Sequence, residues 1–395
     1  NSGYARDFIE LIDRVLPDLV SKNIKVISNA GGVNPEACRD QLLKIAKSKG
    51  IDIKIGIING DNIYENLDEL IDSGIDFKNL ETGEDFANIK DKVYSANVYI
   101  DSFSISHALD QGAQIVLAGR VSDPGLALGP AIHEFGWKPE QIDLIAAGTL
   151  AGHITECGAQ CTGGNYSRWH EVKDLELIGY PIIEIQENGE FLITKHEGTG
   201  GLVNRYTVSE QILYEMGNPE CYISPDVCVD FTSFKLHDMG CNKVRISDVK
   251  GKEPTSTYKV SISYFAGYKA SGQLTISGPN ALEKAKLVAK LIWSRLEKAG
   301  CIYEDKLTEF LGLSSCHGDI VGTPSQINEI VLRLSVKDNN KVMVNRFGKE
   351  IAPVITNGPP GVTGFAGGRP KAQEIIAYWP ALIPKDVIMT KVDVS

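Results

Sequence analysis

Three residues with reactive side chains, His153, Glu156 and Cys157, stand close together near the middle of the chain. On a helix, positions i, i+3 and i+4 share one face, so the three side chains would lie together. An imidazole beside a thiol favours a thiolate nucleophile, and a carboxylate one turn away can orient the imidazole. We therefore predict that these three residues are catalytic. A packed helix with a buried, hydrogen-bonded histidine would give the same pattern, and the HExxH metal-binding spacing is absent, so no metal site is predicted.

A polar turn follows an apolar run of strand type at residues 115–118 and contains Arg120, Ser122 and Asp123. Open α/β sheets bind their ligands just beyond the carboxyl ends of such strands. A guanidinium group can hold a carboxylate or phosphate, with Asp123 fixing its orientation. We predict that this turn binds an anionic substrate. A structural Arg–Asp pair at the start of the next helix is the alternative.

Two glycine-rich turns also follow predicted strands, and glycine allows the backbone to approach an anion closely. The turn residues predicted to bind substrate are Asn29, Gly31, Gly32, Thr199, Gly200 and Gly201. The first turn contains neither GxGxxG nor a Walker lysine, so a tight turn without a ligand is its alternative. For the second turn, a loop at the domain junction is the alternative. A third segment, residues 357–370, is long, irregular and glycine-rich, and offers Phe365 and Arg369 as binding residues or serves as a linker.

Strands and helices alternate in the first part of the chain. Helical periodicity covers residues 4–22, and a second helix is predicted from Asn34 as N-cap and Pro35 as first residue to about Lys49. Strands are predicted at residues 24–27, 53–58, 93–100 and 114–118. This alternation predicts βαβ units and a doubly wound, mostly parallel sheet. We expect a Rossmann-like α/β domain over residues 1–178.

Short strands that alternate between apolar and polar residues dominate after about residue 180. One long helix is predicted at residues 281–299. We also predict a hairpin whose turn is residues 338–340 and whose second strand is residues 341–344. A short helix at residues 372–378 is predicted after the glycine- and proline-rich loop. Residues 179–395 are therefore expected to form a smaller α+β domain.

Composition excludes several classes of protein. The 395 residues have a net charge of −11, which argues against a nucleic-acid partner. There is no apolar run of membrane-spanning length and no recognisable signal peptide. Eight cysteines spread over the chain do not form a disulfide framework, so we expect mostly buried, reduced thiols in a cytoplasmic protein. Because no Met opens the chain, we expect a fragment or a processed form.

A set of motifs resembles the acyclic terpene utilisation A (AtuA) family. The matching segments are Gly3–Phe8, Asn29–Pro35, Gly119–Asp123, Ile132–Trp137, Ala146–Gly164, Gly198–Val203, Glu210–Gln211, Tyr214–Glu215 and Pro225–Val227. The similarity is dense from residue 3 to about residue 235 and thinner afterwards. Family members usually begin with an additional strand and glycine-rich turn, which this sequence lacks.

The resemblance implies a place in acyclic terpene or branched acyl-CoA breakdown. We expect an enzyme that acts on an acyl-CoA or related anionic carbonyl compound by hydration, lyase chemistry or acyl transfer, with CoA as part of the substrate. A homo-oligomer is expected. The resemblance also implies a ferredoxin-fold module, here on a separate small subunit. A non-catalytic binding or scaffold subunit that assembles with this module is therefore the alternative function. A nucleotide-dependent oxidoreductase is disfavoured because no dinucleotide fingerprint is present.

Overall fold

The computed structural model describes residues 3–313, 315–320, 322, 326–364 and 367–395. They form two compact units, which are considered separately. Unit 1 comprises Asn1–Phe86, Ser95–Ile262 and Pro380–Ser395, and unit 2 comprises Ala87–Tyr94 and Ser263–Trp379. The predicted domain boundary at residues 178/179 falls inside unit 1. The long strand β12 (Thr257–Ser277) instead runs from one unit into the other.

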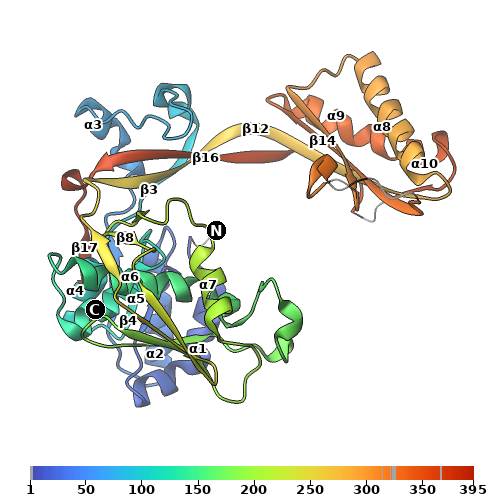
Figure 1. Cartoon of the computed structure of the whole chain (residues 1–395). Helices are drawn as coiled ribbons and strands as arrows, with labels where there is room; N and C mark the ends of the chain where they lie inside the picture. The colour runs from blue at the N-terminus through green and yellow to red at the C-terminus, as the bar shows by residue number, and fades with distance from the viewer. Residues whose placement is uncertain (1–2, 314, 321, 323–325, 365–366) are drawn as a thin grey trace. The chain divides into compact units, whose positions relative to one another are not determined.

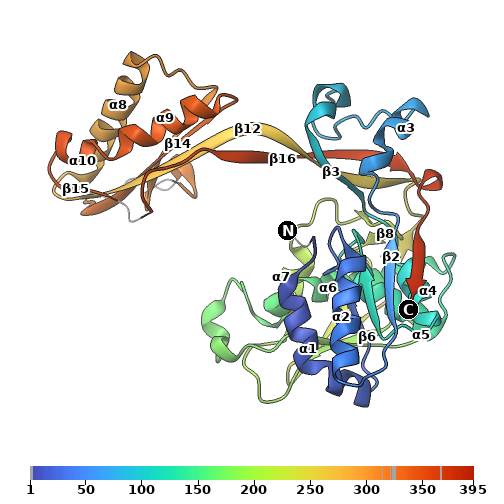
Figure 2. The same ribbon diagram turned by 180° about the vertical axis from the view of Figure 1, so that it is seen from behind.

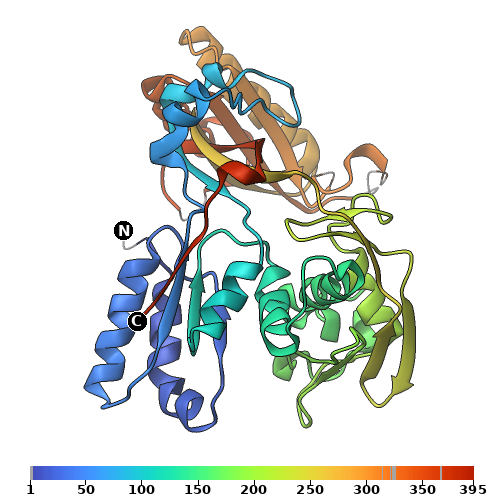
Figure 3. The same cartoon turned by 90° about the vertical axis from the view of Figure 1, so that its left-hand side faces the viewer.

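A small, mostly parallel sheet forms one part of unit 1 (Figure 1). Its strands, in spatial order, are β1 (Val26–Ser28), β4 (Ile115–Ala118), β2 (Ile55–Asn59) and β17 (Lys391–Val394). The first three strands are parallel, whereas β17 lies antiparallel to β2 at the edge, as Figure 3 shows. The C-terminal segment thus completes a sheet begun by the N-terminal part of the chain.

Helices cover both faces of this sheet. Two of them, α1 (Arg6–Ser21) and α2 (Pro35–Ser48), lie side by side on one face (Figure 2) and bury Leu16, Leu42 and Ile57 in a shared core. The predicted N-cap is confirmed, since the Asn34 side chain accepts a hydrogen bond of 3.2 Å from the amide of Ala37. On the other face, α4 (Phe103–Asp110) packs against β2.

The predicted mixture of helices and strands is therefore confirmed, but the extended parallel sheet is not. The strand expected at residues 93–100 is β3 (Val93–Val98), and it pairs with β12 rather than with β1, β2 or β4. Alternation of elements predicts which residues are strands, whereas pairing depends on contacts with residues far along the chain.

A helix buried on all sides, α6 (Ile142–Glu156), organises the rest of unit 1. Every residue from 145 to 154 is buried, as expected for a helix that is apolar around its whole circumference. Two helices pack against it, α5 (Gly125–Phe135) and α7 (Arg205–Leu213). Two antiparallel sheets surround these helices. The first sheet contains, in spatial order, β5 (Pro181–Ile185), β6 (Phe191–Lys195), β10 (Lys243–Ser247) and β9 (Lys235–Gly240). The second contains β11 (Lys250–Lys252), β8 (Cys228–Asp230) and β7 (Tyr222–Ile223).

Unit 2 contains an antiparallel sheet covered by helices (Figure 1). Its elements follow β12 in the order α8 (Ala281–Lys298), β13 (Asp305–Leu311), β14 (Glu329–Asp338), α9 (Lys341–Ile351), α10 (Val354–Asn357) and β15 (Val362–Thr363). The spatial order β13-β14-β12-β15, with every neighbouring pair antiparallel, is a βαββαβ arrangement of ferredoxin-like type. The chain thus has a ferredoxin-like unit of its own, whereas such a module was expected on a separate small subunit.

Two predictions near the C-terminus are wrong, whereas the long helix at residues 281–299 is confirmed as α8. The residues predicted as the second strand of a hairpin begin helix α9, because the Asn340 side chain accepts hydrogen bonds from the amides of Val342 and Met343. Residues 373–378 of the segment predicted as a short terminal helix belong to strand β16 (Gln373–Pro384), which pairs with β12.

One pair of cysteines also departs from the expectation of reduced thiols. Cys221 and Cys228 form a disulfide, with their Cα atoms 5.2 Å apart. The pairing of β7 with β8 brings the two residues together, which their separation in sequence does not reveal. The other six cysteines are free.

Short elements complete the described chain. They are α3 (Leu67–Asp72) and single 3-10 turns at Tyr64–Asn66, Phe86–Asn88, Lys90–Lys92, Gly158–Thr162, Trp169–Glu171, Leu175–Leu177, Gly318–Ile320 and Lys385–Val387. Among the helices that the structure describes, none has both the length and the apolar character needed to cross a membrane.

Candidate active site

A cavity of about 560 Å³ in unit 1 brings together three of the predicted site residues, Ser122, Asp123 and Glu156. The first two come from the turn after β4, and the third is the last residue of α6. Residues that the sequence did not single out complete much of the wall. They include Tyr99, Glu215, Tyr222, Tyr258 and Lys259.

A glycine explains why this turn lies beside the end of α6. A Cβ atom on Gly152 would be only 2.2 Å from the carbonyl oxygen of Pro124. The absent side chain therefore lets the helix pack directly against the backbone that follows Ser122 and Asp123. Glu156 stands one turn further along the same face of the helix, which places it at the cavity.

His153 lies behind Glu156 and is 1% exposed. Its ring packs against two aromatic rings, those of Tyr222 and Phe231, with centroids 5.2 and 5.4 Å away. Its backbone carbonyl accepts a hydrogen bond of 2.8 Å from the side chain of Gln211, which ties the end of α6 to α7. The histidine is thus fixed in position and is not itself part of the cavity wall.

The two nitrogens of His153 have different partners. Nε2 lies 3.2 Å from the carbonyl oxygen of Ile212, and because a carbonyl only accepts, Nε2 carries a proton. Nδ1 lies 2.8 Å from Oε1 of Glu156, a distance that fits an ion pair although the contact is not aligned as a hydrogen bond. The imidazole and the carboxyl group of Glu156 therefore lie in direct contact at the edge of the cavity.

Ser122 lines the same cavity, and its hydroxyl group is buried. The residue is 8% exposed, and its Oγ has no hydrogen-bond partner among the residues that the structure describes. A buried hydroxyl without a partner costs about 1–3 kcal/mol. A bound molecule that reached this buried hydroxyl would supply the missing partner and recover this free energy.

Positive charge lies around Tyr99 on the cavity wall. The guanidinium carbon of Arg120 is 5.4 Å from the centre of the Tyr99 ring, and Nζ of Lys259 is 5.9 Å from it. The backbone amide of Arg120 donates a hydrogen bond of 2.8 Å to the buried carboxylate of Asp61. Gly119 permits this approach, since its Cβ would be 2.2 Å from Oδ1 of Asp61. Arg120 therefore has a fixed backbone and an exposed side chain.

Cys157 follows Glu156 and is partly buried. Burial raises the pKa of its thiol, a hydrogen bond with Gln211 opposes this, and the nearby carboxylates of Glu156, Glu215 and Asp123 raise the pKa further. The thiol form is thus favoured over the thiolate at neutral pH. Cys157 is not among the residues that line the cavity.

The two glycine-rich turns lie apart from this cavity. In the first turn, the amide of Gly32 donates to the carbonyl of Asn29, and Asn29 and Gly32 border a separate open depression, whereas Gly31 packs against Pro35. In the second turn, the amides of Thr199, Gly200 and Gly201 donate to backbone carbonyl groups. Amides already engaged in this way are not free to form an anion nest.

A hydrogen-bonded network stands behind another part of the cavity wall. The hydroxyl of Tyr258 donates to Asp101, and the amide and hydroxyl of Ser102 donate to the two oxygens of Asp226, each at 2.8 Å. Burial, followed by the charge of Asp101, raises the pKa of Asp226 to about 7. Burial lowers the pKa of Lys385, whose ammonium group donates to the carbonyl of Pro225.

Comparison with known proteins gives one match. A family model described as "Acyclic terpene utilisation family protein AtuA" matches residues 1–394. The chain belongs to the AtuA family. Searches of curated proteins and of solved structures gave no match. Membership indicates a role in acyclic terpene utilisation. Among the residues that the structure describes, no group of three or more His, Cys, Asp or Glu side chains is arranged to hold a metal ion.

Several residues around the cavity of this AtuA protein were not predicted as site residues. Glu215 and Pro225, which line it, and Gln211, which holds His153, lie in segments that resemble the family. Their position in segments that resemble the family was the signal that could have identified them. Tyr258 and Lys259 carry no comparable signal, because their sequence pattern is that of an ordinary strand.

Proposed function

We propose that this AtuA protein is an enzyme of hydratase or lyase type that acts on an acyl-CoA or related anionic carbonyl compound. The observation that carries the proposal is the position of Glu156 at a cavity, with the buried His153 2.8 Å behind it. A carboxyl group in contact with an imidazole at the edge of a cavity can accept or donate a proton during catalysis. Glu156 would be the catalytic acid–base, and His153 the residue that positions it.

The substrate carbonyl would accept a hydrogen bond from the unpaired hydroxyl of Ser122, which would stabilise negative charge that develops on the oxygen. The anionic part of the substrate would lie near Lys259 and Arg120. Glu156 would then remove a proton from the carbon next to the carbonyl, for which it must lie within hydrogen-bond reach of that proton. Acyl transfer would instead require the thiolate of Cys157, and the raised pKa of that thiol works against it.

A panel of straight and branched acyl-CoA esters, with products followed by mass spectrometry, tests this proposal. With an active substrate, Glu156→Gln should lower kcat by about 100-fold or more while the fold is retained. Glu140→Gln, which removes an exposed carboxylate of unit 1, is the matched control and should keep full activity. Equal activity of both variants would refute the assignment of Glu156. Loss of activity in Cys157→Ser, with an acyl adduct on the unmodified enzyme, would show acyl transfer.

The alternative is a non-catalytic scaffold subunit that assembles with a small ferredoxin-fold partner. This alternative would be favoured if His153 and Glu156 were both buried and paired with each other, with no cavity beside them. The cavity beside Glu156 supports the enzyme instead. The alternative predicts that a partner of about a hundred residues co-purifies with the native protein. A homo-oligomer without such a partner would speak against it.

A further inference from the structure

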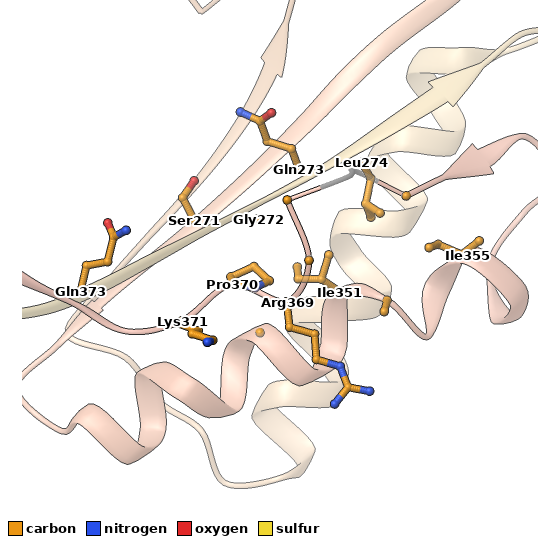
Figure 4. Close-up of a pocket in the computed structure, with 15 residues that line it drawn as sticks. Ser271, Gly272, Gln273, Leu274, Ile351, Ile355, Arg369, Pro370, Lys371 and Gln373 are labelled. Carbon is orange, nitrogen blue, oxygen red and sulfur yellow. The ribbon is translucent and has the colours of Figure 1, made fainter.

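A second cavity, of about 720 Å³, lies in unit 2, which the proposed function does not use (Figure 4). One wall is strand β12 at residues 271–274. The opposite wall comes from α9, α10 and the backbone of residues 367–371. The glycine-rich segment noted in the sequence therefore borders a cavity. Phe365, which the same prediction named, lies outside the described residues.

Apolar side chains form one side of this cavity. Leu274, Ile351 and Pro370 lie on the same side of β12 in Figure 4, whereas Ser271 and Gln273 point to the opposite side of the strand. Leu274 and Ile351 are buried, at 2% and 6% exposure, but Ile355 at the end of the cavity is 38% exposed. A hydrocarbon group placed here would cover the exposed part of Ile355, which now contacts water.

Two cationic side chains, Arg369 and Lys371, border the same cavity. Both are exposed, and neither has an ion-pair or hydrogen-bond partner in the described part of the chain. Unit 2 as a whole contains 16 Lys and Arg against 11 Asp and Glu, although the complete chain has a net charge of −11. The surroundings of the cavity therefore favour an anion.

The segment that carries these cations is held against its neighbours by close backbone packing. A Cβ atom on Gly348 would be 2.1 Å from the carbonyl oxygen of Pro370, and one on Gly272 would be 3.1 Å from the Pro370 ring. The amide of Ala372 donates a hydrogen bond of 2.9 Å to the side chain of Asn345. The backbone is thus fixed at Pro370 and Ala372, so binding need not order this part of the segment, which favours affinity.

We propose that this cavity binds a small amphipathic anion. Arg369 and Lys371 would hold its phosphate or carboxylate group, since both cations form charge-assisted hydrogen bonds with such oxygens. Its hydrocarbon part would lie against Leu274, Ile351 and Ile355. The site goes beyond the proposed function, because no residue of the catalytic cavity in unit 1 takes part in it.

Isothermal titration calorimetry of the full chain with hexyl phosphate tests the proposal. Heptanoate tests whether a carboxylate replaces the phosphate, and inorganic phosphate and hexanol present the headgroup and the hydrocarbon separately. We expect hexyl phosphate to bind at least about tenfold more tightly than inorganic phosphate or hexanol. Equal affinity for inorganic phosphate, or no detectable binding of hexyl phosphate and heptanoate, would overturn the proposal.

Two variants localise the binding. The double variant Arg369→Ala/Lys371→Ala should weaken hexyl phosphate binding by about tenfold or more. Lys286→Ala/Lys290→Ala removes the same charge from the exposed face of α8 and should bind as the unmodified chain does. Similar affinities in both double variants would refute the site.

A third variant, Ala352→Phe, adds bulk at an exposed residue of the cavity wall and should also weaken binding. Glu156→Gln should leave hexyl phosphate binding unchanged, so failure of this proposal and failure of the proposed function can be told apart. Recruitment to vesicles that contain phosphatidic acid, without binding of hexyl phosphate, would assign the cations to a membrane surface and overturn a small-molecule site.

Discussion

Replacing Asp226 by asparagine is expected to change how the stability of unit 1 depends on pH. Burial and the nearby charge of Asp101 raise the pKa of Asp226 from 3.8 to about 7. Between these values the folded state holds a proton that the unfolded state has released. The free energy of unfolding therefore falls as the pH rises from about 4 to about 7, and this contribution is constant above that window.

The size of the effect follows from the shift. One pKa unit corresponds to 1.36 kcal/mol, so the ionised Asp226 lowers the free energy of unfolding by about 4 kcal/mol at pH 8. An asparagine is neutral at every pH and keeps both contacts with Ser102. Its carbonyl can accept from the amide, and its amide can donate to the hydroxyl oxygen. Asp226→Asn should therefore be more stable than the unmodified protein at pH 8, and the gain should largely vanish near pH 4.

Urea unfolding at a series of pH values, followed by circular dichroism and tryptophan fluorescence, measures this difference. Asp238→Asn is the matched control. Hydrogen bonds from the backbone amides of Arg205 and Gly240 lower the pKa of Asp238, so its contribution is lost only as the pH falls below its usual value. The effect of the control should be the same at pH 5 and pH 8. An effect of Asp226→Asn that is likewise independent of pH would refute the reasoning.

Three further perturbations test the packing of the two units. Gly152→Ala should destabilise unit 1 by about 1–3 kcal/mol in urea unfolding, because the new Cβ would contact the Pro124 carbonyl oxygen; a gain in stability, as helix propensity alone predicts, would contradict the close approach. Asn340→Ala should cost unit 2 about 1 kcal/mol and Asn340→Ser much less, whereas equal costs would argue against an N-cap. Alkylation of the denatured protein without reductant should modify six of the eight cysteines and leave Cys221 and Cys228 unmodified; eight modified residues would show that this disulfide is absent.

Local patterns in the sequence were sufficient for many elements. Apolar periodicity located α1, and the Asn34-Pro35 signal located the start of α2, because both depend on contacts within a few residues. The long helix α8 was predicted for the same reason. The motifs that resemble the AtuA family were also correctly interpreted.

Local patterns failed where two choices were close in energy. Residues 338–344 suit a hairpin turn, but Asn340 also caps a helix, and packing of Val344 and Phe347 into the core of unit 2 favours α9. Similarly, residues 372–378 follow a loop and have apolar residues at mixed spacing. Pairing of residues 373–378 with β12, which lies far earlier in the chain, makes them a strand.

Sequence patterns alone were enough to place Ser122 and Asp123 in a polar turn after a strand and Glu156 on a helix, since residue type and spacing along one element are local properties. Folding of distant segments brings these three residues to one cavity, places His153 behind it and keeps the glycine-rich turns away from it. The reason is physical: the close contact of Gly152 with Pro124, and the partners of each backbone amide, depend on how distant segments pack.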